Sequence, residues 1–410
     1  MTEPIRVLHF ADAHIGMENY GRTDAETGLN TRVRDYLRRM DDIVAYAREH
    51  EVDLVIFAGD AFKTRSPNPT FQREFAHRIR DLSLLAPTVL LVGNHDLPPN
   101  ALKASSIEIY DTLAVPNVWV AYDYTGQVIE TRRGPVYVAA APYPIRARLL
   151  QNVAGRTIAE TDDLLASQMT RIIEALAEEA DQHGDMPRLL TGHFTASGAV
   201  VGSERAIMLG RDIAVQLAAL ADDRWDYVAL GHIHKHQNLT HGRIDAPPVV
   251  YSGSIERIDF GEEGDPKGFC WVELARDDTR WSFVELDVRP FVTLRADLRQ
   301  SLNPTQETVA LIGKYNLREA VVRVLLDFTP ESHARFTESA VRDALRAAGA
   351  FTVAAVKKTI EQPARARLGT NPEGLDHLQL LEHYLLSREV TPARREELLD
   401  AVRELLGDGD

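Results

Sequence analysis

Five short motifs in this 410-residue chain contain the residue types that bind metal ions or transfer protons. The candidate side chains are Asp12, His14, Asp60, Asn94, His95, His193, His232 and His234. Without His95, they offer oxygen and nitrogen donors and no sulfur, a set that suits two adjacent borderline cations such as manganese, iron or zinc sharing one carboxylate. Two ions about 3.5–4 Å apart can activate a bridging water and stabilise the oxygens of a phosphoryl displacement. The predicted chemistry is therefore phosphoester hydrolysis.

The clearest motif is Leu90–Asp96, LLVGNHD, in which an apolar run typical of a buried strand stops at Gly93. Asn94 and His95 then follow at the carboxyl end of the strand, where open α/β sheets place their chemistry. Asn94 offers a neutral oxygen ligand, and His95 can donate or accept a proton near neutral pH.

The other motifs repeat this arrangement. Asp12 and His14 are separated by one residue, as are His232 and His234, so in extended backbone both members of a pair point to one side and can hold one ion. One such motif alone is more often a turn. Five in one chain favour a single site, and we expect the five strand ends to belong to one sheet.

The elements predicted before residue 289 begin with a parallel βαβαβ unit. Its strands are expected over 5–10, 54–58 and 88–92, and its helices over 31–50 and from Asn68 or Thr70 to Leu84. An antiparallel section is expected next, with strands over 118–121, 127–131 and 136–141 and a hairpin at 133–135. A long helix should begin at Thr161 or Asp162 and end at Ala180, and strands over 188–191 and 227–230 should follow. Antiparallel strands are then expected over 249–255, 268–274, 281–286 and 290–295.

Four parts of the chain are expected. Residues 1–288 form the main α/β domain and residues 289–361 form a small α+β domain, with helices over 305–313 and 334–348 and strands over 320–328 and 351–360. Residues 362–374 form a linker, and residues 375–410 form a hairpin of two amphipathic helices. The leucines of this hairpin exceed what a solvated tail should expose, so we expect it to dock on a partner.

Composition restricts the class of protein. A hydrophobic content of 44% and a charged content of 26% are typical of a globular protein. No apolar run approaches the ~20 residues of a membrane span. No signal peptide is evident, so a cytoplasmic, nucleoid-associated location is expected. The single cysteine, Cys270, excludes an internal disulfide and a thiolate-rich zinc site. The formal net charge of −15 argues against tight, unaided binding of this chain to a phosphate backbone, so metals or a partner should help.

The motifs DAH, GD, GNHD, GHF and GHIH, in this order, resemble those of the calcineurin-like metallophosphoesterase superfamily. The stretch Val250–Phe269, VYSGSIERIDFGEEGDPKGF, with GHIHKHQ and DAHIG, is more specific and is similar to SbcD-type DNA double-strand-break repair nucleases. The resemblance implies a four-layer metallophosphoesterase β-sandwich flanked by helices, with a small α+β capping domain that helps to select DNA and a C-terminal helical hairpin. It covers residues 1 to about 290 well and the rest in layout only.

Carried over by position, the resemblance implies two metal sites that share Asp60. The first would consist of Asp12, His14, Asp60 and His234, and the second of Asp60, Asn94, His193 and His232. His95 would face the scissile phosphate and assist departure of the sugar oxygen, or support the ligands from behind together with Asp96. Some family members have histidine at the position of Lys63, where lysine could act as a plain positive charge or be merely exposed.

Three further residues are weaker candidates for substrate binding. His236 is close to the last motif in sequence, while Arg257 and Lys267 could equally contact a DNA backbone or form surface ion pairs. The remaining histidines are expected to be structural or solvated, and Cys270 is expected to be a small core residue.

The resemblance implies a manganese-dependent 3′-to-5′ exonuclease and endonuclease acting on double-strand ends, hairpins and single strands. It also implies a homodimer within a heterotetramer with an SbcC-type ATPase, whose coiled coil would receive the C-terminal hairpin. No nucleotide-binding Gly-x-x-x-x-Gly-Lys-Ser/Thr loop is present, so ATP use would belong to the partner. Two alternatives stay open, namely a phosphatase or phosphodiesterase on a smaller substrate and a mainly architectural subunit that tethers DNA ends.

Overall fold

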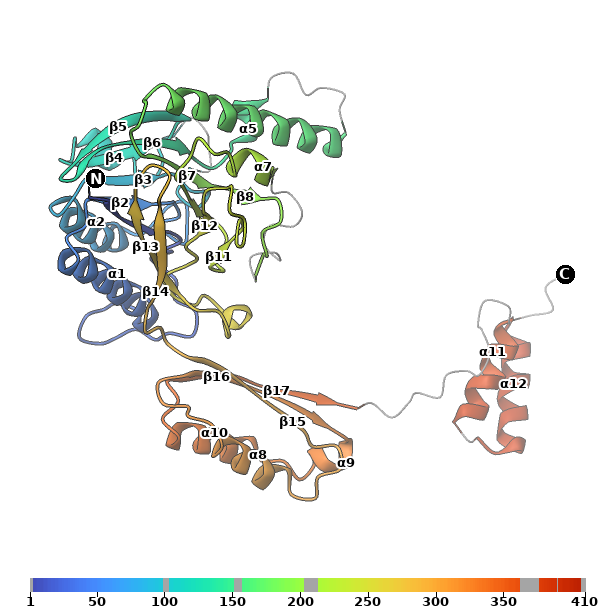
Figure 1. The fold of residues 1–410 in the computed structure, drawn as a ribbon. Helices are drawn as coiled ribbons and strands as arrows, with labels where there is room; N and C mark the ends of the chain where they lie inside the picture. The colour runs from blue at the N-terminus through green and yellow to red at the C-terminus, as the bar shows by residue number, and fades with distance from the viewer. Residues whose placement is uncertain are drawn as a thin grey trace. The chain divides into compact units, whose positions relative to one another are not determined.

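A computed structural model describes residues 3–98, 103–150, 157–202, 213–361, 376–388 and 390–406. The chain divides into two compact units (Figure 1). The larger consists of Met1–Thr293, Asn316–Arg323 and Leu345–Ala355, and the smaller consists of Leu294–Tyr315, Val324–Ala344 and Val356–Asp410. All the candidate site residues belong to the larger unit.

The first sheet of the larger unit has six strands in the order β14-β13-β1-β2-β3-β4. Its parallel strands are β1 (Ile5–Phe10), β2 (Leu54–Phe57), β3 (Thr88–Leu91) and β4 (Val118–Ala121). The antiparallel strands β13 (Gly268–Leu274) and β14 (Arg280–Glu285) extend it beyond β1. The predicted parallel βαβαβ unit is therefore confirmed.

The second sheet has the order β11-β12-β10-β7-β6-β5. Its strands are β5 (Thr125–Thr131), β6 (Gly134–Ala141), β7 (Arg188–His193), β10 (Tyr227–Gly231), β11 (Gln237–Asn238) and β12 (Val249–Tyr251). The expectation that the motif strands share one sheet was wrong, because the β5–β6 hairpin starts this second sheet. The expected antiparallel strand over 249–255 is also corrected, since β12 runs parallel to β10 and antiparallel only to the short β11.

Apolar side chains hold the layers together. Val7, Ile56, Val138 and Ala229 belong to the core between the two sheets. The helices α1 (Thr31–Glu49) and α2 (Pro69–Ser83) cover the outer face of the first sheet, and α5 (Ile158–Asp181) covers that of the second (Figure 1). The order helix, sheet, sheet, helix is the four-layer sandwich that the resemblance implied.

Side-chain caps fix where the long helices begin. Asn68 caps α2 through a 2.8 Å hydrogen bond from Thr70 N. The helix α5 begins at Ile158 instead of Thr161 or Asp162, because Thr157 and Glu160 form a reciprocal capping box. The shorter elements of the larger unit are α3 (Ile109–Thr112), α4 (Arg146–Leu149), α7 (Leu217–Leu220), β8 (Thr195–Ala196), β9 (Ala214–Val215) and the 3-10 turn Phe260–Glu262.

A three-stranded sheet of order β15-β16-β17 follows the sandwich in sequence. Its strands are β15 (Phe291–Asp297), β16 (Val321–Phe328) and β17 (Thr352–Ile360), and the helices of this region are α8 (Pro304–Ile312), α9 (Pro330–His333) and α10 (Glu338–Ala347). The single helix expected over 334–348 begins only at Glu338, because α9 ends at His333. The predicted α+β composition is thus present.

The last two helices are α11 (His377–Ser387) and α12 (Pro392–Leu406), which contact each other as a hairpin does. Leu385 and Leu399 are buried there. The expected linker, 362–374, lies outside the described residues, and the four-part division of the chain stays a prediction.

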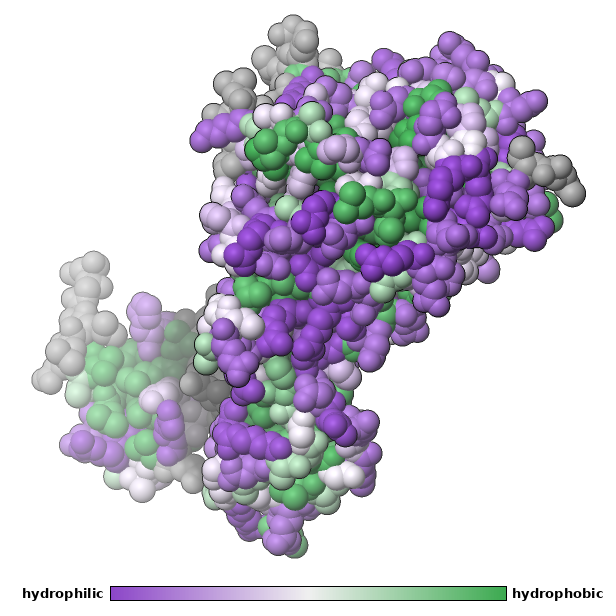
Figure 2. All heavy atoms as spheres, turned by 90° about the vertical axis from the view of Figure 1, so that its left-hand side faces the viewer, coloured by the Kyte–Doolittle hydropathy of each residue, from purple (hydrophilic) through white to green (hydrophobic). Residues whose placement is uncertain are grey.

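The visible surface is mostly hydrophilic with apolar patches (Figure 2). Exposed large apolar residues in and around α2 and α3 include Leu84, Ile109 and Leu113. Among the described helices, none has the length and apolar character required to cross a membrane.

Candidate metal centre

The structure brings all five motifs together at the carboxyl ends of strands from both sheets. Their residues follow β1 (Asp12, His14), β2 (Asp60) and β3 (Asn94, His95) in the first sheet, and end or follow β7 (His193) and β10 (His232, His234) in the second. The parallel strands of the two stacked sheets end at the same edge of the sandwich. The motifs therefore meet there, as they would have done at the edge of a single sheet.

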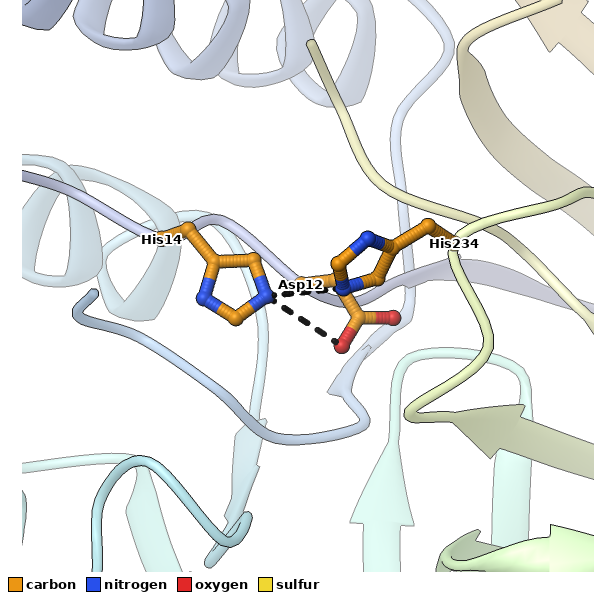
Figure 3. A group of neighbouring side chains, drawn as sticks. All are labelled: Asp12, His14 and His234. Carbon is orange, nitrogen blue, oxygen red and sulfur yellow. Dashed lines mark hydrogen bonds and ion pairs between the residues drawn. The ribbon is translucent and has the colours of Figure 1, made fainter. Parts of the chain in front are cut away.

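A first group consists of Asp12, His14 and His234 (Figure 3). Their potential ligand atoms lie within 4.8 Å of one another. His14 Nε2 is 3.0 Å from His234 Nε2 and 3.9 Å from Asp12 Oδ1. Both residues that follow β1 are almost fully buried.

A second group consists of Asp60, Asn94, His193 and His232. Asn94 Oδ1 lies 3.1 Å from His193 Nε2 and 3.0 Å from His232 Nδ1. His193 Nε2 is also 3.4 Å from Asp60 Oδ1. The asparagine that follows β3 is thus in direct contact with both histidines of this group.

Asp60 lies between the two groups. Its Oδ2 is 3.8 Å from His14 Nε2 of the first group, and its Oδ1 is 3.4 Å from His193 Nε2 of the second. Oδ1 also accepts a 2.8 Å hydrogen bond from the backbone N–H of His95. The two oxygens therefore face different groups, as a carboxylate shared between two ions would.

Fixed tautomers show that these side chains fit cations. His193 Nδ1 lies 2.7 Å from Ala58 O, and His234 Nδ1 lies 2.8 Å from Glu262 Oε1. Each Nδ1 must carry a proton to satisfy its acceptor, so the two Nε2 atoms face the centre and are the nitrogens that would bind an ion after losing any proton of their own. There they meet other acceptors, including Asn94 Oδ1. Converging lone pairs on nitrogen and oxygen are the donor set of a borderline divalent cation.

Burial and charge shift the pKa values of these groups in opposite directions. Burial lowers the pKa of His14 well below its usual range. Burial also opposes protonation of His193, but the Asp60 carboxylate outweighs it and raises the pKa of His193 to about 9. Burial would raise the pKa of Asp60, but the neighbouring histidines hold it well below its usual value. Asp60 is therefore ionised and available as a ligand at neutral pH.

The backbone around the centre is strained. Asp12, His14, Asp60 and His232 have φ values of 53°, 41°, 62° and 96°, in the left-handed region that costs non-glycine residues about 1–3 kcal/mol each. Strain of this kind persists only where the surrounding structure enforces it, and it concentrates at functional sites.

Two motif glycines are required by close approach. A Cβ at Gly59, where φ is +97°, would lie 2.3 Å from His193 Nδ1. A Cβ at Gly93 would lie 2.2 Å from Asp60 Oδ1. The glycines of the GD and GNHD motifs therefore make room for the candidate ligands.

Asp96 ties two of the motifs together. Its Oδ2 accepts hydrogen bonds from the backbone N–H groups of Asp60 (2.9 Å) and Gly93 (3.0 Å), and its Oδ1 accepts from that of Ala61 (3.0 Å). Burial, and then the charge of Asp60, raise the pKa of Asp96 to about 7. This buried carboxyl group fixes the loop after β2 against the loop after β3.

His95 and Lys63 are linked through the backbone. His95 Nδ1 lies 2.7 Å from Lys63 O, which fixes the proton on Nδ1 and leaves Nε2 as the reactive nitrogen. The His95 ring is 5.0 Å from the His14 ring between centroids. Lys63 therefore orients His95 through its backbone carbonyl group. The identity of the side chain at position 63 could not have predicted this contact.

Glu262 and Lys267 form a buried ion pair, 2.9 Å apart, behind the first group. Glu262 accepts from His234 Nδ1, and Lys267 Nζ donates to His234 O (3.0 Å). Burial would raise the pKa of Glu262, but the charge of Lys267 and the hydrogen bond from His234 hold it far below its usual range. Sequence reasoning missed Glu262, although it stands within the specific Val250–Phe269 stretch.

The expected surface positions of Lys267 and Arg257 were wrong. Lys267 has no exposed side-chain area, because it is enclosed with Glu262. Arg257 is half-buried and donates to the carbonyl oxygens of Glu262, Asp265 and Arg289. These contacts hold the segment before β13, and a contact of Arg257 with DNA stays a prediction.

The residues expected to be structural are placed as such. His9 is buried between the sheets, 3.2 Å from both Tyr227 Oη and Leu230 O, and burial lowers its pKa to about 3. Cys270 is a fully buried core residue. His236 was instead a weaker candidate for substrate binding, and it stacks on Phe283 and contacts Tyr251 O at 2.9 Å.

Comparison with known proteins agrees with this geometry. The model of the calcineurin-like phosphoesterase family matches residues 5–236, which is more than half of the chain and includes every candidate ligand. The chain is 27% identical over 304 residues to the SbcD component of the SbcCD nuclease of Bacillus subtilis, covering 71% of this chain and 72% of that protein. The resemblance to SbcD-type proteins is thus confirmed.

Two solved structures are also similar. A dimetal phosphatase from Danio rerio has a TM-score of 0.44 at 10% identity, covering 69% of this chain and 96% of its own. The protein TT1561 of Thermus thermophilus has a TM-score of 0.35 at 15% identity, covering 69% and 99%. On its match to the family model, this chain belongs to the calcineurin-like phosphoesterase family.

Proposed function

We propose that this protein is a metal-dependent DNA nuclease, with 3′-to-5′ exonuclease and endonuclease activity, that hydrolyses phosphodiester bonds by a two-metal mechanism. The observation that carries the proposal is the position of Asp60, whose two oxygens face two separate groups of buried nitrogen and oxygen donors. The similarity to the SbcD component of the SbcCD nuclease supports a nucleic acid as the substrate, and we infer that it is DNA.

In this proposal the two groups hold two divalent ions, which we infer to be manganese. Asp12, His14 and His234 would hold one ion, Asn94, His193 and His232 would hold the other, and Asp60 would belong to both sets. When bound, such ions supply Lewis-acid stabilisation of the phosphate and a water nucleophile of lowered pKa. The fixed Nδ1 protons of His193 and His234 keep their Nε2 atoms available as ligands.

His95 is proposed to transfer a proton to the departing sugar oxygen. Its Nδ1 proton is held by Lys63 O, so any proton that it delivers is carried on Nε2. Its backbone N–H donates to Asp60 Oδ1, so the position of the ring is tied to that of the shared carboxylate. A positioned histidine of this kind contributes typically about 10²–10⁴-fold to a rate.

We also propose a partner and an assembly. The α11–α12 hairpin would dock on the coiled coil of an SbcC-type ATPase, and the α+β region would help to select DNA. A cavity of about 520 Å³ between α2 and α3 includes Ile109 and Leu113, both more than half exposed. This apolar surface supports a homodimer, within a heterotetramer that includes the ATPase.

The direct test is cleavage of linear and hairpin DNA with manganese, beside a generic small phosphodiester and a phosphopeptide. We expect DNA to be cleaved with the highest kcat/KM, and a chelator to stop the reaction. Hydrolysis of the phosphopeptide alone would show that the protein is a phosphatase on a smaller substrate. Binding to DNA ends without manganese-dependent cleavage would favour an architectural role.

His95→Ala is expected to keep both ions and to lose cleavage by about 10²–10⁴-fold, because the residue moves a proton and binds no metal. Metal content by mass spectrometry and DNA cleavage are measured on the same preparation. His241→Ala, which removes an exposed histidine far along the chain, is the control. Loss of an ion from the His95 variant would instead make His95 a ligand.

A further inference from the structure

A cavity of about 460 Å³ lies beside the candidate metal centre, where β3, β4 and β6 end. Val92 and Tyr143 line it, and Tyr143 N donates to Val92 O at 3.1 Å. The Tyr143 ring lies 5.7 Å from the His232 ring and 6.3 Å from the His193 ring, between centroids. One wall is therefore common to the cavity and the second group of candidate ligands.

Three tyrosine side chains contribute to the lining of this cavity. Tyr122, Tyr124 and Tyr143 line it together with prolines and aliphatic side chains. Tyr122 is 41% exposed, although most large aromatic residues of the larger unit are buried. The volume is within the range of sites that enclose small organic groups. Exposed tyrosine rings beside an apolar floor are suited to stacking flat heterocycles.

The charge around the cavity differs in sign from that of the chain. Its lining includes Arg65, Lys103, Arg146 and Arg148 against Glu108 and Asp123. With Asp162, which lies 2.7 Å from Arg146, one positive charge is in excess in a chain of net charge −15. Both carboxylates are engaged, because Glu108 accepts from Ser105 N (2.8 Å) and Asp123 lies 3.9 Å from Arg148.

Arg65 and Lys103 are the cations best placed to meet a ligand. Both are exposed, and among the described residues no carboxylate lies within ion-pair distance of either. A cationic rim around stacking aromatic rings is the combination that binds unpaired nucleic acid without sequence preference.

The depth of the metal centre points to the same ligand. Asp12 and His193 have no exposed area, and His14 and Asp60 have 2% each. Asn94 and His95 are only partly buried, so a phosphodiester would approach from their side, and a strand that is unpaired there has unstacked bases beside the scissile bond. Unstacked bases need an apolar surface in exchange for the lost stacking.

This inference rests on the proposed nuclease function. We propose that the cavity binds an unpaired nucleobase next to the scissile phosphate, with Tyr122 stacking on the base and Arg65 and Lys103 contacting the flanking phosphates.

The test compares three substrates of the full-length chain with manganese. They are a single-stranded oligonucleotide, the same oligonucleotide with abasic residues flanking the cleaved bond, and the base-free diester bis(p-nitrophenyl) phosphate. We expect abasic residues to lower kcat/KM by about 5- to 100-fold, the effect of losing one stacked base. Tyr122→Ala should lower cleavage of the intact oligonucleotide by the same factor and leave the other two substrates unchanged.

Two further variants make the result specific. Tyr122→Trp should retain cleavage of the intact oligonucleotide, because a larger ring still stacks. Arg65→Gln should make the loss of activity with rising salt less steep than in wild type, because one phosphate contact is removed.

The outcomes separate this inference from the proposed function. Equal cleavage of intact and abasic oligonucleotides, with Tyr122→Ala unchanged on both, would overturn the base site and leave the nuclease intact. Hydrolysis of the small diester without cleavage of any oligonucleotide would overturn the nuclease itself. A loss on all three substrates in Tyr122→Ala would assign Tyr122 to the metal centre's stability and also overturn the base site.

Discussion

The two groups of candidate ligands are built from similar residues but are held in place by different means. In the first group, His234 is oriented by the buried Glu262 carboxylate, which is itself paired with Lys267. In the second, His193 is oriented by the backbone carbonyl of Ala58. A side-chain carboxylate that orients a histidine adds negative charge and can be removed by one substitution. A backbone carbonyl group that orients a histidine is present whatever the side chain, so it depends on the fold.

Because the supports differ, we expect a substitution that disrupts the support of one group to leave metal binding by the other group intact. Side-chain changes in the Val250–Phe269 stretch should affect the first group alone. The support of His193 in the second group is a backbone carbonyl group, so disrupting that support should require a change that moves the backbone or fills the space between strands. Only Asp60, which faces both groups, should couple them.

The largest effect is expected from Asp60→Asn, which removes the charge shared by both groups. We expect the loss of both ions and a decrease of roughly a thousandfold or more in cleavage, since the ions supply the nucleophile. Metal content and kcat are measured together. Asp277→Asn, at an exposed residue with a similar φ of 64°, controls for the backbone conformation. Retention of one ion at full occupancy would contradict a shared role.

Gly59→Ala should break the second group alone. The new Cβ would lie 2.3 Å from His193 Nδ1, so the imidazole must move away from Ala58 O and from Asn94. We expect metal stoichiometry to fall from two to one, with cleavage reduced by about 10²-fold or more. Gly242→Ala is the matched control, because its φ is +79° and its Cβ would meet nothing within 4 Å. An unchanged stoichiometry would refute separate failure.

Glu262→Gln should weaken the first group alone, with about a 10- to 100-fold loss of metal affinity, as for other residues that orient a metal-binding histidine. It also leaves Lys267 buried without its partner, which costs about 3–5 kcal/mol of stability. The double variant Glu262→Gln with Lys267→Met should recover stability but keep the metal defect. Calorimetric titration with manganese and urea unfolding measure the two effects. Recovery of both in the double variant would reduce Glu262 to a purely structural residue.

The smallest effect concerns His9, which joins the strands of the two groups by contacting Tyr227 and Leu230 from β1. Its pKa is about 3 in the fold, against 6.5 in an unfolded chain. The unfolded state therefore binds the additional proton as pH falls below about 6.5, and stability is lost on acidification. Between about pH 7 and about pH 5.5 this loss should be about 1 kcal/mol.

The His9 contribution is measured by urea unfolding of the chelated protein at both pH values. His9→Gln keeps a side chain that can hydrogen bond but does not titrate, so it should lose about 1 kcal/mol less than wild type over this interval. An equal loss in both proteins would mean that His9 is already protonated within the fold.

Much of the fold was accessible from sequence because apolar runs and their end signals are local. The bounds of β1, β4 and β13 agree with the predicted 5–10, 118–121 and 268–274. The pairing of strands could not be predicted in the same way, because an apolar run indicates a buried strand but not which other strand it pairs with. For that reason the second sheet was predicted as part of the first.

The candidate ligands were predictable because each motif contains them side by side in sequence. Glu262 was not, since it is 28 residues from His234 and only the fold brings them together. Lys267 was misplaced for a related reason. Lysine is almost never fully buried unless it is paired, and its partner is a turn residue that sequence reasoning had left unassigned.

The carboxyl group of Asp96 has a consequence for how the protein acquires its ions. By accepting hydrogen bonds from three backbone N–H groups, it joins the loop that carries Asp60 to the loop that carries Asn94. Proteins whose ligands are unstructured until metal arrives spend much of the binding energy on folding. Here hydrogen bonds between protein atoms contribute to that ordering, so we expect the two loops to stay folded when a chelator removes the ions.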